Sequence, residues 1–129
     1  MDIKMNRLIL DNNNREKFII IKDLEGLQKI CSCEIYYFEI VKRKLNIYLI
    51  DGRVISTWKT IKELYNELKD ENFIKINSGC VVNIKYIKEL SGQDVFLDNE
   101  QKLVVSRSEI KLLKSILLQY WEVRLQNNQ

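Results

Sequence analysis

The chain has 129 residues, 46% of them hydrophobic and 30% charged, which suits one compact domain and excludes a disordered tail or low-complexity linker. It contains no histidine, so a Ser-His-Asp triad, a Cys-His dyad and any histidine-containing zinc site are excluded. The formal net charge of +3 is too small to indicate nucleic-acid binding by itself. Whether the charges favour such binding depends on where they lie along the chain.

Residues 1–17 hold a short apolar clump and an asparagine run, and we expect them to form a peripheral leader. From Phe18 onward, short runs of β-branched and aromatic residues alternate with turn signals, of which Asp51-Gly52 is the strongest for a hairpin. Five strands are predicted in this half of the chain, at 18–22, 27–30, 35–41, 45–50 and 53–57.

A helix is predicted over Thr60–Lys69, because apolar residues recur there at helical spacing and Thr60 with Glu63 forms a capping box. A last helix is expected to begin near Ser106 or Ser108 and to carry one apolar face. Between the helices five more strands are predicted, at 73–77, 80–83, 86–90, 94–97 and 102–105. We expect a β-rich α+β domain over 18–122, followed by a polar C-terminal tail over 123–129.

Three cysteines, Cys31, Cys33 and Cys80, leave no plausible ligand set in a chain without histidine. We expect them to be ordinary buried or half-buried residues, and we expect no metal, no cofactor and no catalytic residue. No secretory signal opens the chain, and no apolar run reaches the roughly 20 residues that span a bilayer. The sequence therefore predicts a reduced, cytoplasmic protein.

Several segments, read in order, match the pattern of one known family. The apolar strand Ile35–Glu39 precedes a basic turn and the Asp-Gly hairpin, and the helix with the sequence T-I-K-E-L follows. The segment Phe73–Ile87 is similar to the stretch F-x-R-x-H-x-S-x-x-V-N-x-x-x-I of LytTR-type DNA-binding domains, and Val104–Arg107 resembles that family's v-S-R before a helix. The order and spacing of these motifs over about residues 18–115 make the resemblance specific.

The resemblance implies a bacterial transcription regulator built on a ten-stranded, mostly antiparallel arrangement of small sheets, with a mid-chain helix and a C-terminal helix. Members of the family insert loops, in place of a recognition helix, into successive major grooves of a bent direct-repeat promoter site. The implied partners are double-stranded DNA, a second copy of the chain in a homodimer on DNA, and either a receiver domain or a membrane protein that inhibits a stand-alone member.

The resemblance assigns DNA contacts to three loops. A solvated turn is the other interpretation of the first loop, which is basic throughout. Arg107, in the third loop, can grip guanine or phosphate as a planar fork, or else form a surface ion pair with Glu109. The implied contact residues are Lys42, Arg43 and Lys44 in the first loop, Lys75, Asn77, Ser78 and Lys85 in the second, and Ser106, Arg107 and Lys111 in the third.

The second loop departs from the family pattern at two positions. Asn77 stands where the family often has His, and its amide can still bond the N6/N7 edge of adenine. Ser78 stands where Arg or Asn is common, and it can reach a phosphate or one base atom only. For Asn83 the favoured interpretation is structural, with its side chain bonding loop backbone. The acidic residues Asp94, Asp98 and Glu100 are expected to cluster in a hairpin that faces away from the DNA.

Three classes of function were compared. A sequence-specific DNA-binding regulator fits the ordered motifs, the basic first loop and Arg107. A protein-interaction module that keeps the fold but has lost DNA binding is the alternative, since the second loop lacks the charge that the family often places there. An enzyme is not expected, because the carboxylates form no recognisable acid–base pair.

Overall fold

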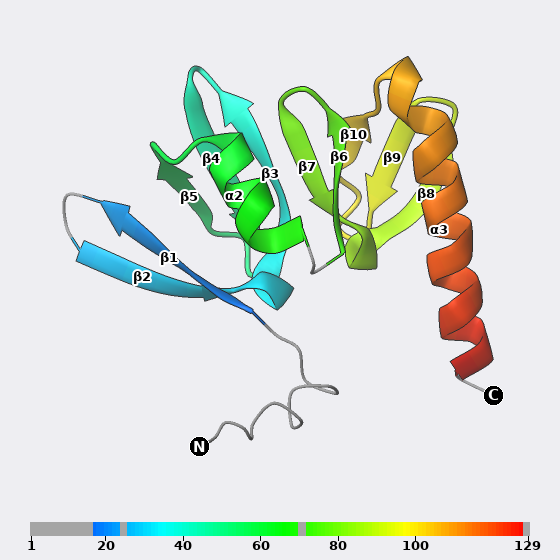
Figure 1. Ribbon diagram of the computed structural model, residues 1–129, viewed down its shortest axis with the longest axis horizontal. Coiled ribbons are helices and arrows are strands. Elements are labelled where there is room, and N and C mark those ends of the chain that lie inside the picture. Colours follow the sequence, from blue (N-terminus) through cyan, green and yellow to red (C-terminus); the bar gives the residue numbers. More distant parts are fainter. Residues whose placement is uncertain (1–16, 24–25, 70–71, 128–129) are drawn as a thin grey trace.

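A computed structural model describes residues 17–23, 26–69 and 72–127. This part of the chain forms ten strands in three antiparallel sheets and two α-helices (Figure 1). The predicted β-rich α+β class is confirmed, and every predicted strand is present with ends shifted by at most two residues. The strands are β1 Phe18–Asp23, β2 Gly26–Cys31, β3 Ile35–Val41, β4 Lys44–Leu49, β5 Val54–Thr57, β6 Phe73–Asn77, β7 Cys80–Asn83, β8 Ile87–Ser91, β9 Asp94–Leu97 and β10 Lys102–Val104.

The two helices begin where local chemistry favours them. Helix α2, Ile61–Leu68, starts at the predicted capping box: the Thr60 hydroxyl accepts the Glu63 N–H at 3.0 Å, and the Glu63 carboxylate accepts the Thr60 N–H at 2.8 Å. Helix α3, Arg107–Asn127, is much longer. It continues through residues 123–127, which the sequence pattern assigned to a polar tail.

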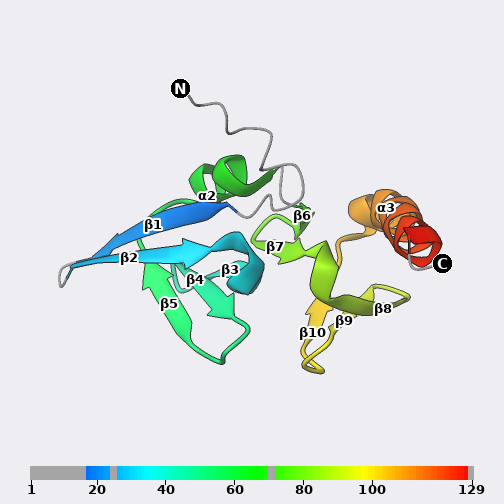
Figure 2. The same ribbon diagram turned by 90° about the horizontal axis from the view of Figure 1, so that it is seen from below.

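A five-stranded sheet with the order β5-β4-β3-β7-β6 forms the centre of the molecule. Strands β8, β9 and β10 form a second sheet beneath α3, and β1 with β2 forms a two-stranded ribbon on the other side (Figure 2). All four residues of β7 are buried. Strand β7 is therefore enclosed on both faces of the sheet.

Two hydrophobic clusters share this central sheet as a wall. The first packs α2 and the β1–β2 ribbon onto one face, where Phe38 and Val81 are fully buried. The second packs α3 and the three-stranded sheet onto the opposite face, against Ile76 and Val82. Because neighbouring residues of a strand point to opposite faces, Val81 and Val82 enter different clusters. Every predicted cysteine position is confirmed, with Cys31 and Cys80 buried and Cys33 half-buried.

Asn83 has the structural role that the sequence favoured. Its Nδ2 donates to the Ile35 carbonyl at 3.0 Å, and its Oδ1 accepts the Lys85 N–H at 3.0 Å. The residue is 3% exposed and its bond to the Ile35 carbonyl is buried, so water does not readily replace that bond. The side chain thereby ties the end of β7 to the start of β3.

We expect Asn83→Ala to lower the free energy of unfolding by roughly 1–3 kcal/mol, because it removes a partner from the buried Ile35 carbonyl and from the part-buried Lys85 N–H. Urea denaturation measures the change. Asn99→Ala is the matched control, since the Asn99 side chain accepts the Gln101 N–H at 3.0 Å in an exposed turn. An equal loss of unfolding free energy in both variants would show that burial does not determine how much the Asn83 side chain contributes to stability.

Candidate nucleic-acid interface

The first loop is the two-residue turn between β3 and β4, where Val41 pairs with Lys44. Its central residues, Lys42 and Arg43, have φ angles of 51° and 72°. Positive φ at both central positions is typical of type I′ hairpin turns, which favour Asn-Gly because other side chains cost roughly 1–2 kcal/mol each there. Both side chains are exposed, and neither forms an ion pair with any described residue. Two free cations therefore occupy a tip whose backbone they strain.

Lys44, the third cation of the triplet, is placed differently. It is the first residue of β4 and is half-buried. Its Nζ lies 4.7 Å from the centre of the Trp58 ring, a cation–π distance. Of the three basic residues, only Lys42 and Arg43 extend freely from the turn.

The second loop is the turn between β6 and β7. Asn77 closes it: its Oδ1 accepts the Gly79 N–H at 2.9 Å, and its Nδ2 donates to the Val104 carbonyl at 2.8 Å. Ser78 is exposed at the tip of the turn, and Lys75 is exposed two residues earlier on β6. The base-reading role expected of Asn77 thus competes with contacts that its amide already makes within the protein.

The third loop joins β10 to α3. The Ser106 N–H donates to the Ile76 carbonyl at 2.9 Å, and the Ser106 hydroxyl lies 3.3 Å from the same oxygen. Arg107 follows as the first residue of α3, where unpaired helix N–H groups favour an anion. Its exposed guanidinium forms no ion pair with Glu109 or with another described carboxylate. Lys111 is exposed one helical turn further on.

The three loops lie at one end of the molecule, the upper end in Figure 1. Backbone bonds connect them: the Ile40 N–H donates to the Gly79 carbonyl at 2.9 Å, and Ser106 bonds to Ile76 as described above. Lys85 does not belong to this end. It lies in the short 3-10 turn after β7, where the neighbouring Ile84 N–H donates to the Asn72 carbonyl before the start of β6. The sequence grouped Lys85 with the second loop, but the full length of β7 separates them.

The acidic residues do not form the single cluster that the sequence suggested. Asp98 and Glu100 lie in the β9–β10 turn at the opposite end from the basic loops, as expected (Figure 1). Asp94, however, is the first residue of β9 and pairs with Val104 beside the third loop. Because a four-residue strand spans about 13 Å, Asp94 and Asp98 face different surroundings. The half-buried Asp94 carboxylate therefore lies at the basic end.

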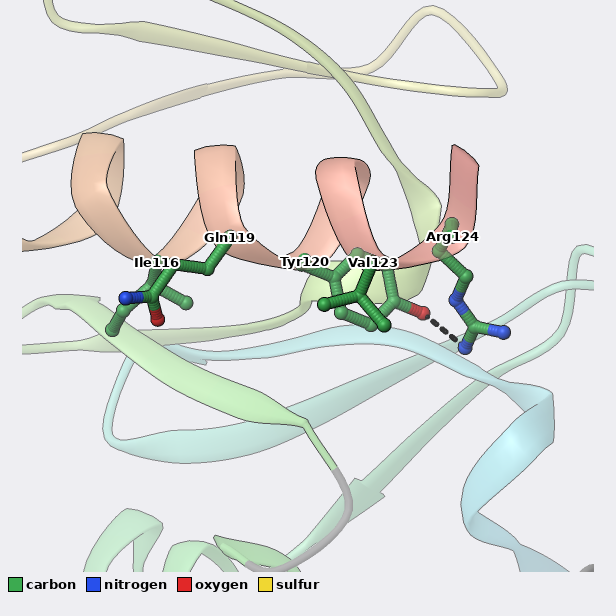
Figure 3. A pocket seen from close by; sticks show the side chains of 5 residues that line it. All are labelled: Ile116, Gln119, Tyr120, Val123 and Arg124. Atoms are coloured by element: carbon green, nitrogen blue, oxygen red, sulfur yellow. Dashed lines mark hydrogen bonds between the residues drawn. The ribbon is translucent and has the colours of Figure 1, made fainter. Parts of the chain in front are cut away.

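One surface groove of the described chain lies away from the three loops. A groove beside α3 is lined by Ile116, Gln119, Tyr120, Val123 and Arg124, and the Arg124 guanidinium donates to the Tyr120 hydroxyl at 2.7 Å (Figure 3). It lies along the C-terminal half of α3, away from Arg107. Among the described residues, no group of three or more Cys, Asp or Glu could hold a metal ion. Neither described helix is long and apolar enough to cross a membrane.

Three titratable groups of the central sheet have raised pKa values. Burial raises the pKa of the Cys80 thiol to about 12, with the Glu39 carboxylate contributing to the shift. This thiol is protonated at neutral pH and therefore a poor nucleophile. Burial also raises the pKa of Glu39, which pairs with Cys80 across β3 and β7, and that of the Tyr37 hydroxyl.

Comparison with known proteins agrees with this geometry. The family model of the LytTr DNA-binding domain matches residues 25–118. Among solved structures, the LytTr DNA-binding domain of a protein described as a methyl-accepting/DNA response regulator from Bacillus cereus is similar. It has 19% sequence identity and a TM-score of 0.66, over 78% of this chain and 95% of the other. No curated protein matches the chain.

The fold and the family match together define the class of protein: a β-rich DNA-binding domain whose strands carry exposed cations on loops at one end. The chain belongs to the LytTr DNA-binding domain family, which confirms the resemblance seen in its motifs. It is a DNA-binding domain of the kind found in transcription regulators.

One residue at the basic end was missed in the sequence. Gln93, in the β8–β9 turn, donates from Nε2 to the Val105 carbonyl at 2.9 Å and accepts the Val105 N–H on its backbone carbonyl at 2.8 Å. A glutamine in a turn carries no signal of its own, since its partner is twelve residues away. Only the folded chain shows that it supports the third loop.

We expect the double substitution Lys42→Asn, Arg43→Gly to stabilise the domain by about 1 kcal/mol or more while weakening DNA binding. Asn-Gly relieves the strain at positive φ, and the loss of two exposed cations should remove the attraction of this turn for phosphates. The slope of log affinity against log salt should flatten by about two units. Urea denaturation and a mobility shift over a salt series measure the two effects.

The control is Glu100→Gly, which relieves a non-glycine residue at φ 72° in the turn at the opposite end. It removes an exposed ion pair with Lys88 that contributes little. This variant should keep the parent's salt slope. A turn variant that binds DNA as the parent does would exclude Lys42 and Arg43 from the interface.

Glu39 makes stability depend on pH. Because burial raises its pKa in the folded state above the unfolded value, the folded state binds this proton more tightly, and the associated stability is lost as pH rises. Between about pH 4.5 and 7, the urea midpoint of the parent should fall relative to that of Glu39→Gln. Parallel pH profiles for the two proteins would contradict this assignment.

Proposed function

We propose that this domain is a sequence-specific transcription regulator that inserts its loops into successive major grooves of a direct-repeat promoter site. The observation that carries the proposal is the placement of Lys42, Arg43 and Arg107 at one end of the molecule, exposed and without carboxylate partners in the described chain. Membership of a DNA-binding family supports it. The manner of insertion is our inference from the loops.

The β3–β4 hairpin suits entry into a major groove. A two-stranded ribbon fits this groove, which is about 12 Å wide. Strand β3 pairs with β7 only as far as Glu39, and the last bond to the β6–β7 hairpin comes from the Ile40 N–H to the Gly79 carbonyl, so the turn beyond Val41 extends past that hairpin. Strained residues cluster at functional sites. Here two cations occupy turn positions where glycine or asparagine would be less strained, which favours a functional role for their charge.

Arg107 is the residue best suited to read a base. Its planar guanidinium can donate two parallel bonds to guanine O6 and N7, or to a phosphate. Arg107 is the first residue of α3, and a guanidinium bound to DNA from there would bring the helix N–H groups close to the phosphate backbone. Ser78 has no charge, so the affinity that some relatives gain at this position is expected to come here from Lys42, Arg43 and Arg107.

The runner-up function is a protein-interaction module of the same fold without DNA binding. The uncharged Asn77 and Ser78 in the second loop favour it. Salt separates the two functions, because binding through phosphates weakens steeply as salt rises. We expect a mobility shift that is lost between low and moderate salt, and selection from random DNA should return two short motifs in the same orientation, about one helical turn apart. Motifs in inverted orientation, or no selection at all, would argue against direct-repeat reading.

Arg107 variants test which group this side chain contacts. Arg107→Ala should lose about tenfold or more on the selected site if the guanidinium reads guanine. Arg107→Lys should then relax the preference at one base position, because an ammonium is a point charge without the planar fork. If Arg107 grips phosphate, the Lys variant should bind nearly as the parent, and the Ala variant should lower the salt slope by about one unit on every sequence. A folded Arg107→Ala that binds like the parent would remove this end of the molecule from the interface.

A further inference from the structure

The second and third loops are joined by side-chain and backbone hydrogen bonds between segments far apart in the sequence. The Asn77 amide donates to the Val104 carbonyl, 27 residues away, at 2.8 Å. The Ser106 N–H donates to the Ile76 carbonyl at 2.9 Å. These bonds attach the end of β6 to the segment that leads directly into Arg107.

The orientation of the Asn77 side chain is set from both ends of its amide. Its Oδ1 accepts the Gly79 N–H at 2.9 Å, while its Nδ2 faces the carbonyl oxygen of Val104. Exchanging the amide oxygen and nitrogen would put like groups together in both contacts, so only one orientation satisfies both partners. Asn77 therefore fixes the β6–β7 turn and the end of β10 with one side chain.

The same segment is held from its other side. Val105 is fully buried in the second hydrophobic cluster. Its N–H donates to the Gln93 carbonyl at 2.8 Å, and its carbonyl accepts the Gln93 side chain at 2.9 Å. The three residues before Arg107 thus have contacts to β6 on one side and to the β8–β9 turn on the other.

We infer that Asn77 is a positioning residue, which sets the spacing between the β6–β7 turn and Arg107 so that both meet the DNA in register. The inference rests on the proposed DNA-reading function and deepens it. A guanidinium reads guanine only within a narrow range of positions, and a fixed loop loses less freedom on binding. Asn77 then acts on base choice through Arg107, and not through a base contact of its own.

The test compares base preference in four proteins: Asn77→Ala, Arg107→Ala, the double variant and the parent, by competition on sites changed one base pair at a time. Asn77→Ala should lower the affinity for the preferred site about tenfold. It should also weaken the base preference at the same position of the site as Arg107→Ala does. When Asn77→Ala is added to Arg107→Ala, it should lower the affinity for the preferred site by less than about twofold. The base contact that Asn77 positions is already absent from the Arg107→Ala protein.

Asn77→Ser separates the tie to Val104 from the closure of the turn. A serine hydroxyl can still accept the Gly79 N–H. The serine side chain is too short to donate to the Val104 carbonyl at the same time, so the bond to β10 is lost. This variant should relax the same base position as Asn77→Ala. Retention of the parent's base preference in Asn77→Ser would overturn the inference.

The matched control is Asn99→Ala, which removes a bond of the same type, from the Gln101 N–H, in the turn at the opposite end. It should leave base preference unchanged even where it lowers stability. Asn77→Ala could instead weaken the preference at a different base position, with affinity losses of the two single variants that multiply in the double variant. That outcome would make Asn77 a direct reader of a base and overturn the positioning role. Failure of the proposed function itself is distinguishable, because Arg107→Ala would then bind like the parent.

Discussion

The enclosure of β7 on both faces is the constraint on which the rest of the structure depends. Val81 packs into one hydrophobic cluster and Cys80 with Val82 into the other, so this short strand joins the two cores. Its neighbours in the sheet, β3 and β6, carry the first and second loops. Because both cores pack on the same strands, the loops of the two halves cannot shift independently of each other.

This shared wall explains how a chain with a net charge of +3 can present a local basic surface. Lys42 and Arg43 lie on a turn and Arg107 lies at a helix start, where their stems extend from the sheet without displacing apolar contacts. The strained turn at Lys42 and Arg43 is supported by a hairpin whose inward residues, Phe38 and Leu45 among them, are almost completely buried. Packing of the hairpin offsets the cost of left-handed backbone at its tip.

The hydrogen bonds at the basic end show how a surface built from loops can be held in place. A recognition helix supplies a fixed array of side chains through its own backbone bonds, but loops need support from elsewhere. Here Asn77, Gln93 and Ser106 supply it through bonds to neighbouring carbonyl groups. These uncharged polar residues fix the segment that leads into Arg107.

The elements of this fold could be predicted from the sequence because their signals are local. The Thr60–Glu63 capping box, the Asp51-Gly52 turn and the alternating strands depend on residues a few positions apart, and ordered family motifs identified the class of domain. Long-range placement was decided by the tertiary structure alone. It put Lys85 at the far end of β7, brought Asp94 to the basic end, set Lys44 against Trp58 and bonded Asn77 to Val104. These relations follow from strand direction and from which faces are buried together, and neither is encoded in the spacing of residues along the chain.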